Sequence, residues 1–590
     1  MTKIITENFR VGIAKDFYES FIYKNDSSVN AFESELTTYN SDNSLSLTNT
    51  HIDDITDMTK KQIENVNFED IFYIMASSID SNTDIQNTQK EKREFLRRVI
   101  FGNKIDHSNM KYIFTNNSWT SNTVYDSFDD TVDIEDLNMF VSVLDGESGE
   151  GPYKIFKCIR NTGLPSTVEP STSNLDSIGE VTLSDGYTWK YMFEVSASDY
   201  IEHGIVNGLP YVANNDVIDS AVENISDIVI ENAIPNQFSD YIIGTSNNST
   251  DTIVPSTIES VTLDNLSSNR YEIIIKTSID IRTEDDAYVG MYLRIIDPGQ
   301  AKAVYDILDT AVLPGNTNKL SVYVESDIDL KNVSPSLSNK SCDIVPKIEV
   351  SKTNGEQCIA YGELNSQGTL SYIHFVNKGS EYKYASAKLI LPPALETQAK
   401  TELRVVVSPT GGHGSDPISE MGMSRISVVT NFYTDDLTNT PASNYYTKIG
   451  IVKNPTFKNE EYNQTFDNRI SIIANTDFTS TVNKNYYVSQ EVGDEVISAR
   501  IHDLSYDSNT DQTTFYLVDY IGDFIGNFSA SDAEIKESMI STQVESVTIN
   551  NVSNTNIYNA FSGEILHFID FDPIERREDR REKVKFIFDF

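Results

Sequence analysis

The stretch GGHGSD at residues 411–416 brings together the three side-chain types of a nucleophilic triad, because His413, Ser415 and Asp416 are nearly adjacent. Such a triad would support acyl transfer, with serine as the nucleophile and histidine as the base. Functional triads, however, are assembled from distant segments, since neighbours along the chain do not supply the required geometry. The glycines are typical of a loop that turns sharply. We therefore interpret 411–416 as a structural loop and predict no catalytic residue there.

A calcium loop is the second candidate site. The motif DSNTD occurs at 80–84 and again at 507–511, which puts oxygen-bearing side chains at the first, third and fifth positions of such a loop. The first copy also has Glu91 at the twelfth position, but Ile85 stands where the loop needs a glycine. The second copy lacks the glutamate. We predict no metal site, and ion binding at 80–91 stays open.

Motifs for other chemistries are missing. The chain has no GxxxxGK[ST], HExxH or GxSxG sequence, and its seven histidines are scattered. Its three cysteines form neither a CxxC pair nor a disulfide framework, so we expect free thiols in a reducing compartment. With 89 acidic residues, pairs of carboxylates are too common to indicate a glycosidase. The sequence thus favours a protein that is not an enzyme and holds no cofactor.

The charge balance bears on the partners. The chain has 46 basic and 89 acidic residues, a net charge of −43, which repels nucleic acid and anionic membranes. This charge serves solubility or a partner with a basic face. We find no secretory leader and no apolar run of roughly 18 residues, so we expect no membrane partner and synthesis in the cytosol.

Hydrophobic periodicity predicts which elements hold these residues. Helical spacing marks 8–22, 68–79 and 90–102, and from 111 onward short strands alternate with turn-rich gaps. The segment DGYTWKYMFEV at 185–195 alternates most clearly. Its predicted buried face carries Tyr187, Trp189, Tyr191, Phe193 and Val195, and its other face carries Thr188, Lys190, Met192 and Glu194. We expect that aromatic face to pack against a second sheet.

The last residues form a second aromatic strand. Val584, Phe586, Phe588 and Phe590 share a face, so we expect the terminus to be buried, with Phe586 and Phe588 in the same core as the strand at 185–195. A run of arginines precedes it, and its members are Arg576, Arg577, Arg580 and Arg581. The interleaved acids allow a self-neutralised turn, and the alternative is an interface with an acidic neighbour.

Six stretches, in the same order, resemble the dimeric baseplate wedge protein of T-even-like contractile-tailed phages. They are NFRVGIAKDFYESFI (8–22), NNSWTSNTVYDSFDDT (116–131), YKIFKCIRNTGLPSTVEPS (153–171), DGYTWKYMFEV (185–195), GGHGSDPISEMGMSRISVVTNF (411–432) and GEILHFIDF…KVKFIFDF (563–590). The resemblance covers 1–25, 93–205, 402–465 and 555–590. Family members are often shorter, so this chain looks like an enlarged version.

The resemblance implies a β-sandwich-like core sheet with flanking helices in a mainly β protein, together with inserted β-rich domains. It predicts five parts: 1–205 with the helices and the first part of the core, 206–401 as an insertion, 402–465 as continued core, 466–554 as a second insertion, and 555–590 as the last core strands. It also implies a homodimer without catalysis that holds neighbouring wedge proteins together in the tail baseplate of the virion, after assembly in the host cytoplasm, and transmits conformational change.

Two other functions compete with this one. The insertions could form a host-surface or glycan-binding module, with Tyr382, Tyr384, Tyr445 and Tyr446 as exposed aromatic residues. A glycan-degrading enzyme is permitted by the acidic composition, but no motif supports it. The sequence does not assign a role to the insertions or a partner to either face.

Overall fold

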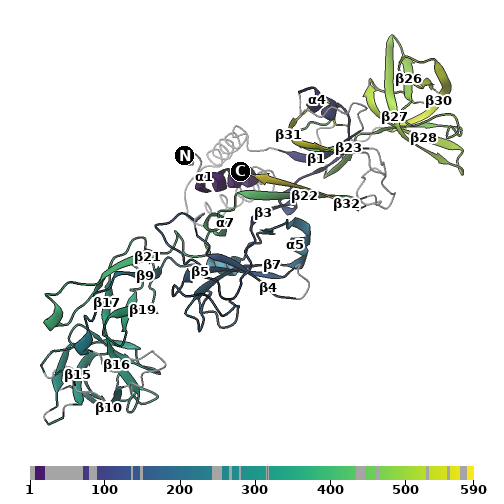
Figure 1. The fold of residues 1–590 in the computed structure, drawn as a ribbon. Helices are drawn as coiled ribbons and strands as arrows, with labels where there is room; N and C mark the ends of the chain where they lie inside the picture. Colours follow the sequence, from purple (N-terminus) through teal and green to yellow (C-terminus); the bar gives the residue numbers. More distant parts are fainter. Residues whose placement is uncertain are drawn as a thin grey trace, which may run out of the picture. The chain divides into compact units, whose positions relative to one another are not determined.

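The protein is mainly β with few helices, as Figure 1 shows for the computed structural model, and this confirms the predicted fold class. The structure describes residues 7–19, 71–78, 89–134, 137–146, 151–241, 256–264, 269–277, 281–282, 284–313, 315–316, 318–433, 446–458, 464–526, 531–553, 558–571 and 581–590. Every structural statement below concerns these residues.

The chain divides into two compact units. The first comprises Met1–Thr115, Ser198–Tyr211 and Met423–Phe590, and the second comprises Asn116–Ala197 and Val212–Gly422. This division differs from the predicted one, in which 1–205 contributes to a single core with the C-terminal strands. Residues 116–197 instead share a unit with the long segment that follows 211.

One sheet of the first unit is built from segments that lie far apart in the sequence. Its strand order is β32-β22-β3-β8, with β3 at Met110–Thr115, β8 at Gly208–Pro210, β22 at Arg425–Tyr433 and β32 at Arg581–Asp589. The longest pairing joins β22 to β32 in antiparallel register, from Arg425 opposite Asp589 to Tyr433 opposite Arg581. The C-terminal strand is therefore part of a sheet, as its alternating aromatic residues indicate.

The first helix, α1 at Glu7–Glu19, contacts this last strand. The ring of Phe17 lies 5.0 Å from that of Phe588 and 5.1 Å from that of Phe590. Arg10 forms an ion pair of 2.7 Å with Asp589 and also donates to the backbone carbonyl of Phe590. The two ends of the chain are thus held together by aromatic packing and by a charged hydrogen bond.

A five-stranded sheet completes this part of the first unit, in the order β24-β2-β1-β23-β31. Its strands are β1 (Phe72–Ser78), β2 (Val99–Lys104), β23 (Tyr446–Lys453), β24 (Thr465–Asp467) and β31 (Glu564–Asp570), and the helix α4 (Gln89–Arg97) contacts β1. The short helix η1 (His107–Asn109) instead contacts β3 and β22 of the four-stranded sheet, and Glu202 of α5 (Ala197–His203) forms an ion pair with Lys583 of β32.

The helix predicted at 68–79 is wrong, since β1 occupies most of it, and the helix predicted at 90–102 ends at Arg97 before β2 begins. Tertiary contacts determine this structure, because β1 pairs with β2 on one side and with β23 on the other, and Tyr73 to Ala76 are fully buried. An apolar run buried on both faces has no alternation, so periodicity cannot separate a strand from a helix.

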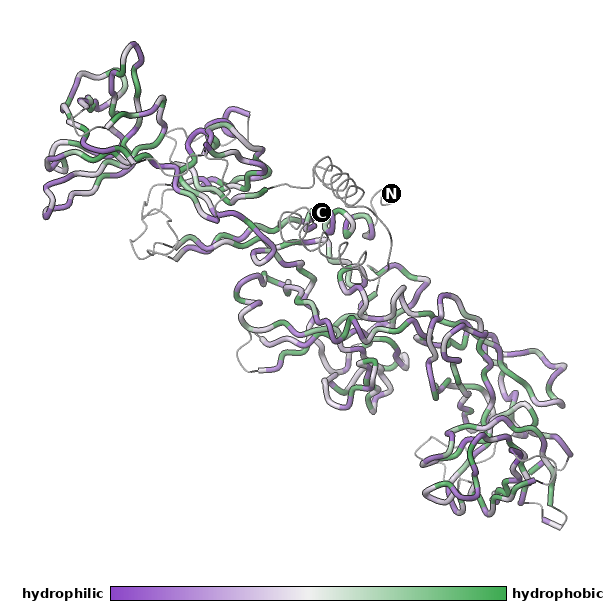
Figure 2. The backbone as a smooth tube through the Cα atoms, turned by 180° about the vertical axis from the view of Figure 1, so that it is seen from behind, coloured by the Kyte–Doolittle hydropathy of each residue, from purple (hydrophilic) through white to green (hydrophobic). Residues whose placement is uncertain are grey.

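A closed barrel forms the rest of the first unit, in the order β25-β28-β27-β26-β29-β30. Its strands are β25 (Ile470–Ala474), β26 (Tyr487–Val492), β27 (Glu495–Asp507), β28 (Gln512–Ile521), β29 (Ser531–Lys536) and β30 (Gln543–Ser553), and Figure 2 shows hydrophobic and hydrophilic residues alternating along them. The strands lie within the predicted insertion 466–554. Closure leaves no free sheet edge in this barrel.

The second unit contains three sheets and a strand pair. The four-stranded sheet β4-β5-β7-β6 consists of β4 (Phe140–Leu144), β5 (Tyr153–Arg160), β6 (Glu180–Thr182) and β7 (Thr188–Val195). The sheet β19-β18-β17-β20 consists of β17 (Lys347–Val350), β18 (Ile359–Leu364), β19 (Leu370–Asn377) and β20 (Ala387–Leu389), and β9 (Ile225–Asn232) pairs with β21 (Glu402–Val407).

The largest sheet of the second unit has seven strands in the order β13-β12-β16-β10-β11-β15-β14. They are β10 (Ser256–Leu263), β11 (Arg270–Lys276), β12 (Tyr292–Ile295), β13 (Val304–Asp306), β14 (Asp309–Val312), β15 (Lys319–Glu325) and β16 (Ser341–Val345). Short helices connect the sheets: α6 (Asn215–Asp219), η3 (Ser239–Tyr241), η4 (Pro393–Leu395) and α7 (Pro417–Glu420). One hydrophobic core runs through this region from Ile225 to Val405.

The strand at 185–195 has its core inside the second unit. Trp189 is fully buried, with its ring stacked 5.7 Å from that of Tyr187 and edge-on at 5.5 Å to that of Tyr125. The rest of this core comes mainly from the segment before β4 and from β4 and β5. The prediction that Phe586 and Phe588 share this core is wrong, because they lie on β32 in the first unit.

Both faces of β7 are buried, which also differs from the one-sided strand predicted. Lys190 and Met192, assigned to the open face, are each 1% exposed, and Tyr191 on the predicted buried face is half-buried. Irregularities in the pairing with β5, at Ile155/Phe156 and at Cys158/Arg160, accompany this pattern. The burial of Lys190 directs attention to the charged groups inside this unit.

Candidate functional site

His413, Ser415 and Asp416 form hydrogen bonds with different partners. His413 is buried, and its Nε2 lies 2.7 Å from the Oγ of Ser226 on β9. The hydroxyl of Ser415 donates to backbone carbonyls of its own loop. The carboxylate of Asp416 accepts from the backbone of Ser419 and so caps α7. These three side chains therefore form no triad, which agrees with the structural interpretation of the loop.

His413 belongs to a buried ion cluster that the sequence did not reveal. The Nζ of Lys157 on β5 lies 2.6 Å from Oε2 of Glu420 at the end of α7, and 3.0 Å from Nδ1 of His413. The ammonium also lies 4.3 Å from the ring centroid of Phe128, within the range of a cation–π interaction. Glu420 uses its other oxygen to accept from the backbone N–H of Gly414 at 2.7 Å. The cluster joins the glycine-rich loop to the sheet β4-β5-β7-β6.

The hydrogen bonds fix the tautomer of the histidine. An ammonium group only donates, so Lys157 leaves Nδ1 of His413 as an acceptor, and the hydrogen must be on Nε2. That Nε2–H then donates to Ser226, whose side chain is completely buried. A base needs a free lone pair toward its nucleophile. Ser226, His413 and Glu420 thus resemble a triad in composition, but the histidine has the wrong tautomer for one.

The pKa values of the cluster follow from its burial and its charges. Burial, together with the neighbouring charge of Lys157, lowers the pKa of His413 to about 3, so the ring is neutral near pH 7. Burial alone would raise the pKa of Glu420, but the charge of Lys157 and the contact with His413 outweigh it and lower that pKa to about 2. Burial lowers the pKa of Lys157, and Glu420 acts in the opposite direction. The cluster is a neutral histidine bound to an ion pair.

Two further charged side chains, Lys190 and Glu180, are buried on the same sheet and have separate partners. Lys190 on β7 is 1% exposed and donates to the backbone carbonyl of Ile178. Glu180 on β6 is 5% exposed and forms an ion pair of 2.6 Å with Lys378. A lysine within an otherwise apolar strand, as in YKIFKCI and TWKYMFEV, was the available sequence signal for both buried lysines.

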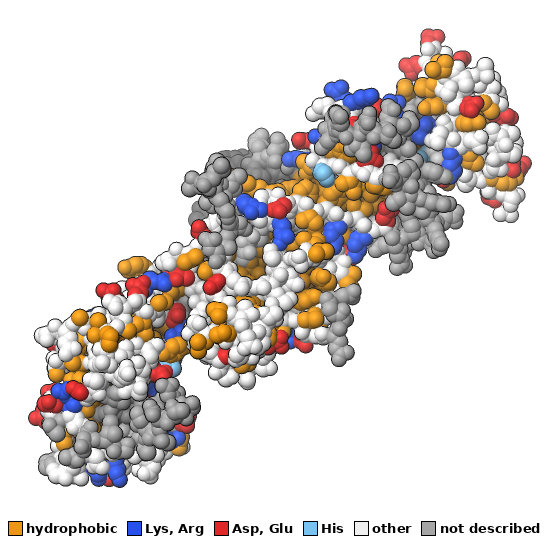
Figure 3. Space-filling view, in the orientation of Figure 1, with side chains coloured by type: hydrophobic (Ala, Val, Ile, Leu, Met, Phe, Trp, Pro, Cys, Tyr) orange, Lys and Arg blue, Asp and Glu red, His pale blue; other side chains and the backbone are white. Residues whose placement is uncertain are grey.

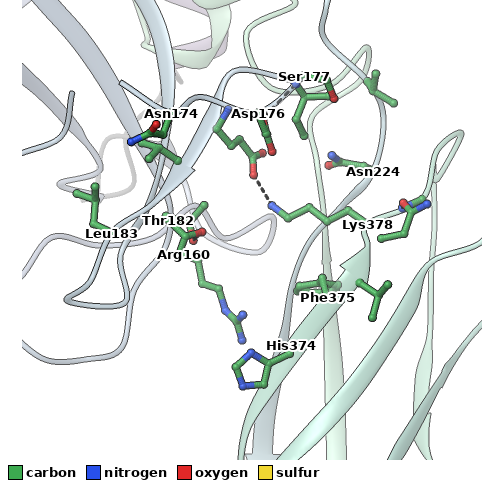
Figure 4. Close-up of a pocket in the computed structure, with 18 of the residues that line it drawn as sticks. Arg160, Asn174, Asp176, Ser177, Thr182, Leu183, Asn224, His374, Phe375 and Lys378 are labelled. Atoms are coloured by element: carbon green, nitrogen blue, oxygen red, sulfur yellow. Dashed lines mark hydrogen bonds and ion pairs between the residues drawn. The ribbon is translucent and has the colours of Figure 1, made fainter. Parts of the chain in front are cut away.

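Beside these charges, a cleft of about 1040 Å³ opens in the second unit. Figure 4 shows Arg160 and Thr182 on one side and His374, Phe375 and Lys378 on the other. The lining also includes serines and asparagines of the segment 171–184, along with Asn224. Its volume exceeds that of a second cleft, of about 610 Å³, which is lined by residues of the first unit such as Arg93 and Tyr520.

The remaining predicted site residues have mixed surroundings. Tyr187, Trp189, Phe193 and Phe586 are buried, whereas Tyr191 and Phe588 are half-buried. Arg576, Arg577 and Arg580 lie outside the described residues, and Arg581 begins β32 with its side chain not described. Of the tyrosines proposed for glycan binding, Tyr382 and Tyr446 are buried, Tyr384 is 82% exposed, and Tyr445 lies outside the described residues.

Only one of the two candidate calcium loops lies within the described residues. The second DSNTD copy forms the turn between β27 and β28, where Asp507 accepts from the backbone of Asn509. The first copy at 80–84 lies outside the described residues. Among the described residues, no three His, Cys, Asp or Glu side chains converge as a metal site would require.

No protein-family model and no curated protein matches this chain. None of the described helices is both long enough and apolar enough to cross a membrane.

Acidification is expected to destabilise the second unit between pH 7 and pH 5. The pKa of His413 is about 3 in the folded protein, below the usual value near 6.5, so the unfolded chain binds an extra proton as the pH falls. The stability that the neutral ring contributes is complete above pH 6.5 and is lost progressively toward pH 3. The loss is about 1.4 kcal/mol per pH unit below 6.5. Urea unfolding at several pH values, followed by tryptophan fluorescence, measures it.

The matched control is His413→Asn, which keeps an amide between Lys157 and Ser226 but cannot titrate. We expect the free energy of unfolding of this variant to fall less steeply as the pH decreases. The difference between the two slopes is the contribution of one titrating group. An unchanged slope in this variant would contradict the assignment of the pH dependence to His413.

Proposed function

We propose that this chain is a structural subunit of the baseplate wedge of a contractile phage tail, where it dimerises and holds neighbouring wedge proteins together. The sequence resemblance supports this proposal, since six stretches resemble that family in the same order. The observation that carries the proposal is the sheet β32-β22-β3-β8 with its helix α1. Its elements β3, β22 and β32, and α1 beside them, each come from a different one of the four segments that the resemblance covers.

The chemistry of the buried ion cluster supports a mechanical role for this part of the chain. Lys157, His413 and Glu420 bind one another, and the neutral histidine donates to a buried serine. These groups are arranged to hold the loop 411–420 on the sheet, because no solvent-exposed nucleophile or base results from their hydrogen bonds. A part that transmits force between neighbours benefits from such fixed internal contacts.

Exposed apolar side chains in the first unit supply surfaces for the proposed partners. Ile13 on α1, Leu566 and Ile569 on β31, and Ile587 on β32 are 37–42% exposed, and Phe9 on α1 is 58% exposed. Figure 3 shows hydrophobic side chains gathered over β31, β22 and β32. Both β31 and β32 are edge strands of their sheets among the described residues, and edge strands can accept a partner strand.

Mass spectrometry of purified tailed particles tests this proposal. Particles of a contractile-tailed phage that encodes this chain are expected to contain it, and dissociated baseplates are expected to retain it together with wedge proteins. The purified chain is expected to elute, with light-scattering detection, at twice its mass of 66.3 kDa. Particles that lack the chain would refute the virion role, and a strictly monomeric protein at micromolar concentration would refute the dimer.

A host-surface or glycan-binding module remains the second candidate. Of its four proposed tyrosines, the described ones offer only Tyr384 as an exposed ring, which weakens that version. The observation that favours binding is instead the cleft between residues 160–184 and 356–380.

A further inference from the structure

The cleft of the second unit has the size of a ligand site. Its volume of about 1040 Å³ lies at the upper end of the range for small-molecule and cofactor sites. One wall is the segment 168–184 with β6, and the other is β19 with the turn that follows it. Figure 4 shows Asp176 and Ser177 above the cleft and Phe375 and His374 below it.

Each positively charged or titratable nitrogen group in this cleft already contacts a carboxylate. Arg160 lies 2.9 Å from Asp227, and its guanidinium carbon lies 3.9 Å from the ring centroid of Tyr372. Lys378 pairs with Glu180 at 2.6 Å, as the dashed line in Figure 4 shows. His374 contacts Glu363 at 2.6 Å. An anionic ligand would have to displace these carboxylates, so the cleft does not suit phosphate or sulfate groups.

The acidic groups of the cleft are also engaged. Asp176 accepts from the backbone N–H groups of Ile178 and Glu180 at 3.0 and 2.8 Å. Glu356 accepts from the side-chain amide of Asn377. A cationic ligand would therefore compete with internal donors, and the cleft has no strong preference for either sign of charge.

Neutral hydrogen-bonding groups and a small apolar surface remain for a ligand. Ser173, Asn174, Ser177 and Ser184 are exposed along one wall, and Val376 is 41% exposed on the other. The ring of Phe375 lines the cleft and is half-buried. Hydroxyl and amide groups facing an aromatic ring match a ligand with many hydroxyl groups and apolar C–H faces.

Asn224 is an independent indication of a bound polar ligand. It is 4% exposed, lines the cleft, and its Oδ1 has no hydrogen-bond partner among the described residues. Figure 4 shows its amide turned into the cleft. Leaving a buried acceptor unsatisfied costs about 1–3 kcal/mol, so a hydroxyl donor that reaches this wall would recover that cost.

We propose that this cleft binds a neutral oligosaccharide. Paired charges disfavour ionic ligands, the polar lining disfavours an apolar one, and the volume exceeds the needs of a single sugar. The inference does not rest on the baseplate proposal, because the cleft lies within the second unit and would bind its ligand whether or not the chain is assembled in a virion.

Binding of the full chain to a panel of defined oligosaccharides tests the inference. The panel contains neutral tri- to pentasaccharides of glucose, galactose, mannose and N-acetylglucosamine, with sialylated and sulfated counterparts. We expect at least one neutral member to bind, and titration calorimetry then gives its affinity. Ser177→Trp, at an exposed position of the wall, is expected to weaken this binding at least tenfold by filling the cleft.

The matched control is Ser371→Trp, because Ser371 is exposed on β19 but does not line the cleft. It is expected to keep the affinity of the unmodified chain. Three results would overturn the inference: no neutral member binds at millimolar concentration, binding requires a sialyl or sulfate group, or Ser177→Trp binds as tightly as Ser371→Trp.

Discussion

Replacing Glu420 with alanine is expected to lower the free energy of unfolding of the second unit by about 3–5 kcal/mol. The carboxylate is the only acidic group within hydrogen-bond distance of Lys157 among the described residues, and Lys157 is completely buried. Its removal leaves an ammonium ion in a medium of low polarity and also deprives the N–H of Gly414 of its acceptor. Urea denaturation followed by tryptophan fluorescence measures the loss.

Fluorescence isolates this unit because the chain has two tryptophans, Trp119 and Trp189, and both belong to the second unit. The signal therefore reports the unfolding of that unit even if the first unit unfolds separately.

Two controls define the effect. Asp145→Ala removes the partner of Lys154, which lies on the same strand as Lys157 in an exposed pair of 2.6 Å, and is expected to cost no more than about 1 kcal/mol. The double change Lys157→Met and Glu420→Leu is expected to recover much of the loss, because a buried ion pair contributes little relative to apolar residues of similar size. A Glu420→Ala midpoint equal to that of Asp145→Ala would show that the pair is not buried in solution.

The second large effect is expected for Trp189→Ala, which should cost about 3–5 kcal/mol. The indole is fully buried and fills the space between Tyr125, Tyr187 and the strand β5, so alanine leaves a cavity that rigid neighbours cannot close. Trp119 remains as the fluorescent reporter, and its denaturation midpoint in urea gives the loss.

Trp189→Phe separates the ring from its polar atom. The indole Nε1 has no hydrogen-bond partner among the described residues, so phenylalanine removes no bond and leaves a smaller void. We expect it to be clearly more stable than Trp189→Ala. Equal losses for the two variants would mean that ring volume does not set the stability of this core.

The sequence predicted the β-rich fold and the burial of Trp189, because aromatic alternation in a strand depends on local spacing alone. The sequence wrongly predicted a helix at β1, because an apolar segment paired on both sides shows no strand periodicity. It also placed Phe586 with Trp189, although the covering residues of Trp189 come from the segment just before its own sheet. Which apolar faces meet depends on the chain path, and strand patterns do not encode it.

The ion cluster shows a different limit. Lys157, Ser226 and Glu420 lie far apart in the sequence, and each is an unremarkable residue in its own segment. Spacing along the chain groups His413 with Ser415 and Asp416, whereas in the fold it contacts Lys157 on β5 and Ser226 on β9. The charges that hold the glycine-rich loop in place come together only when the fold brings these segments into contact.

The interleaved path of the chain constrains how its parts can be produced. Residues 116–197 and 212–422 form one unit although a stretch of the other unit separates them. An expression fragment that starts at 212 would keep His413 and Glu420 but omit Lys157. The carboxylate of Glu420 would then lose the ammonium group with which it forms its buried ion pair. Fragments cut at sequence boundaries would therefore yield defective pieces, and dissection of this protein requires a linker that replaces 198–211.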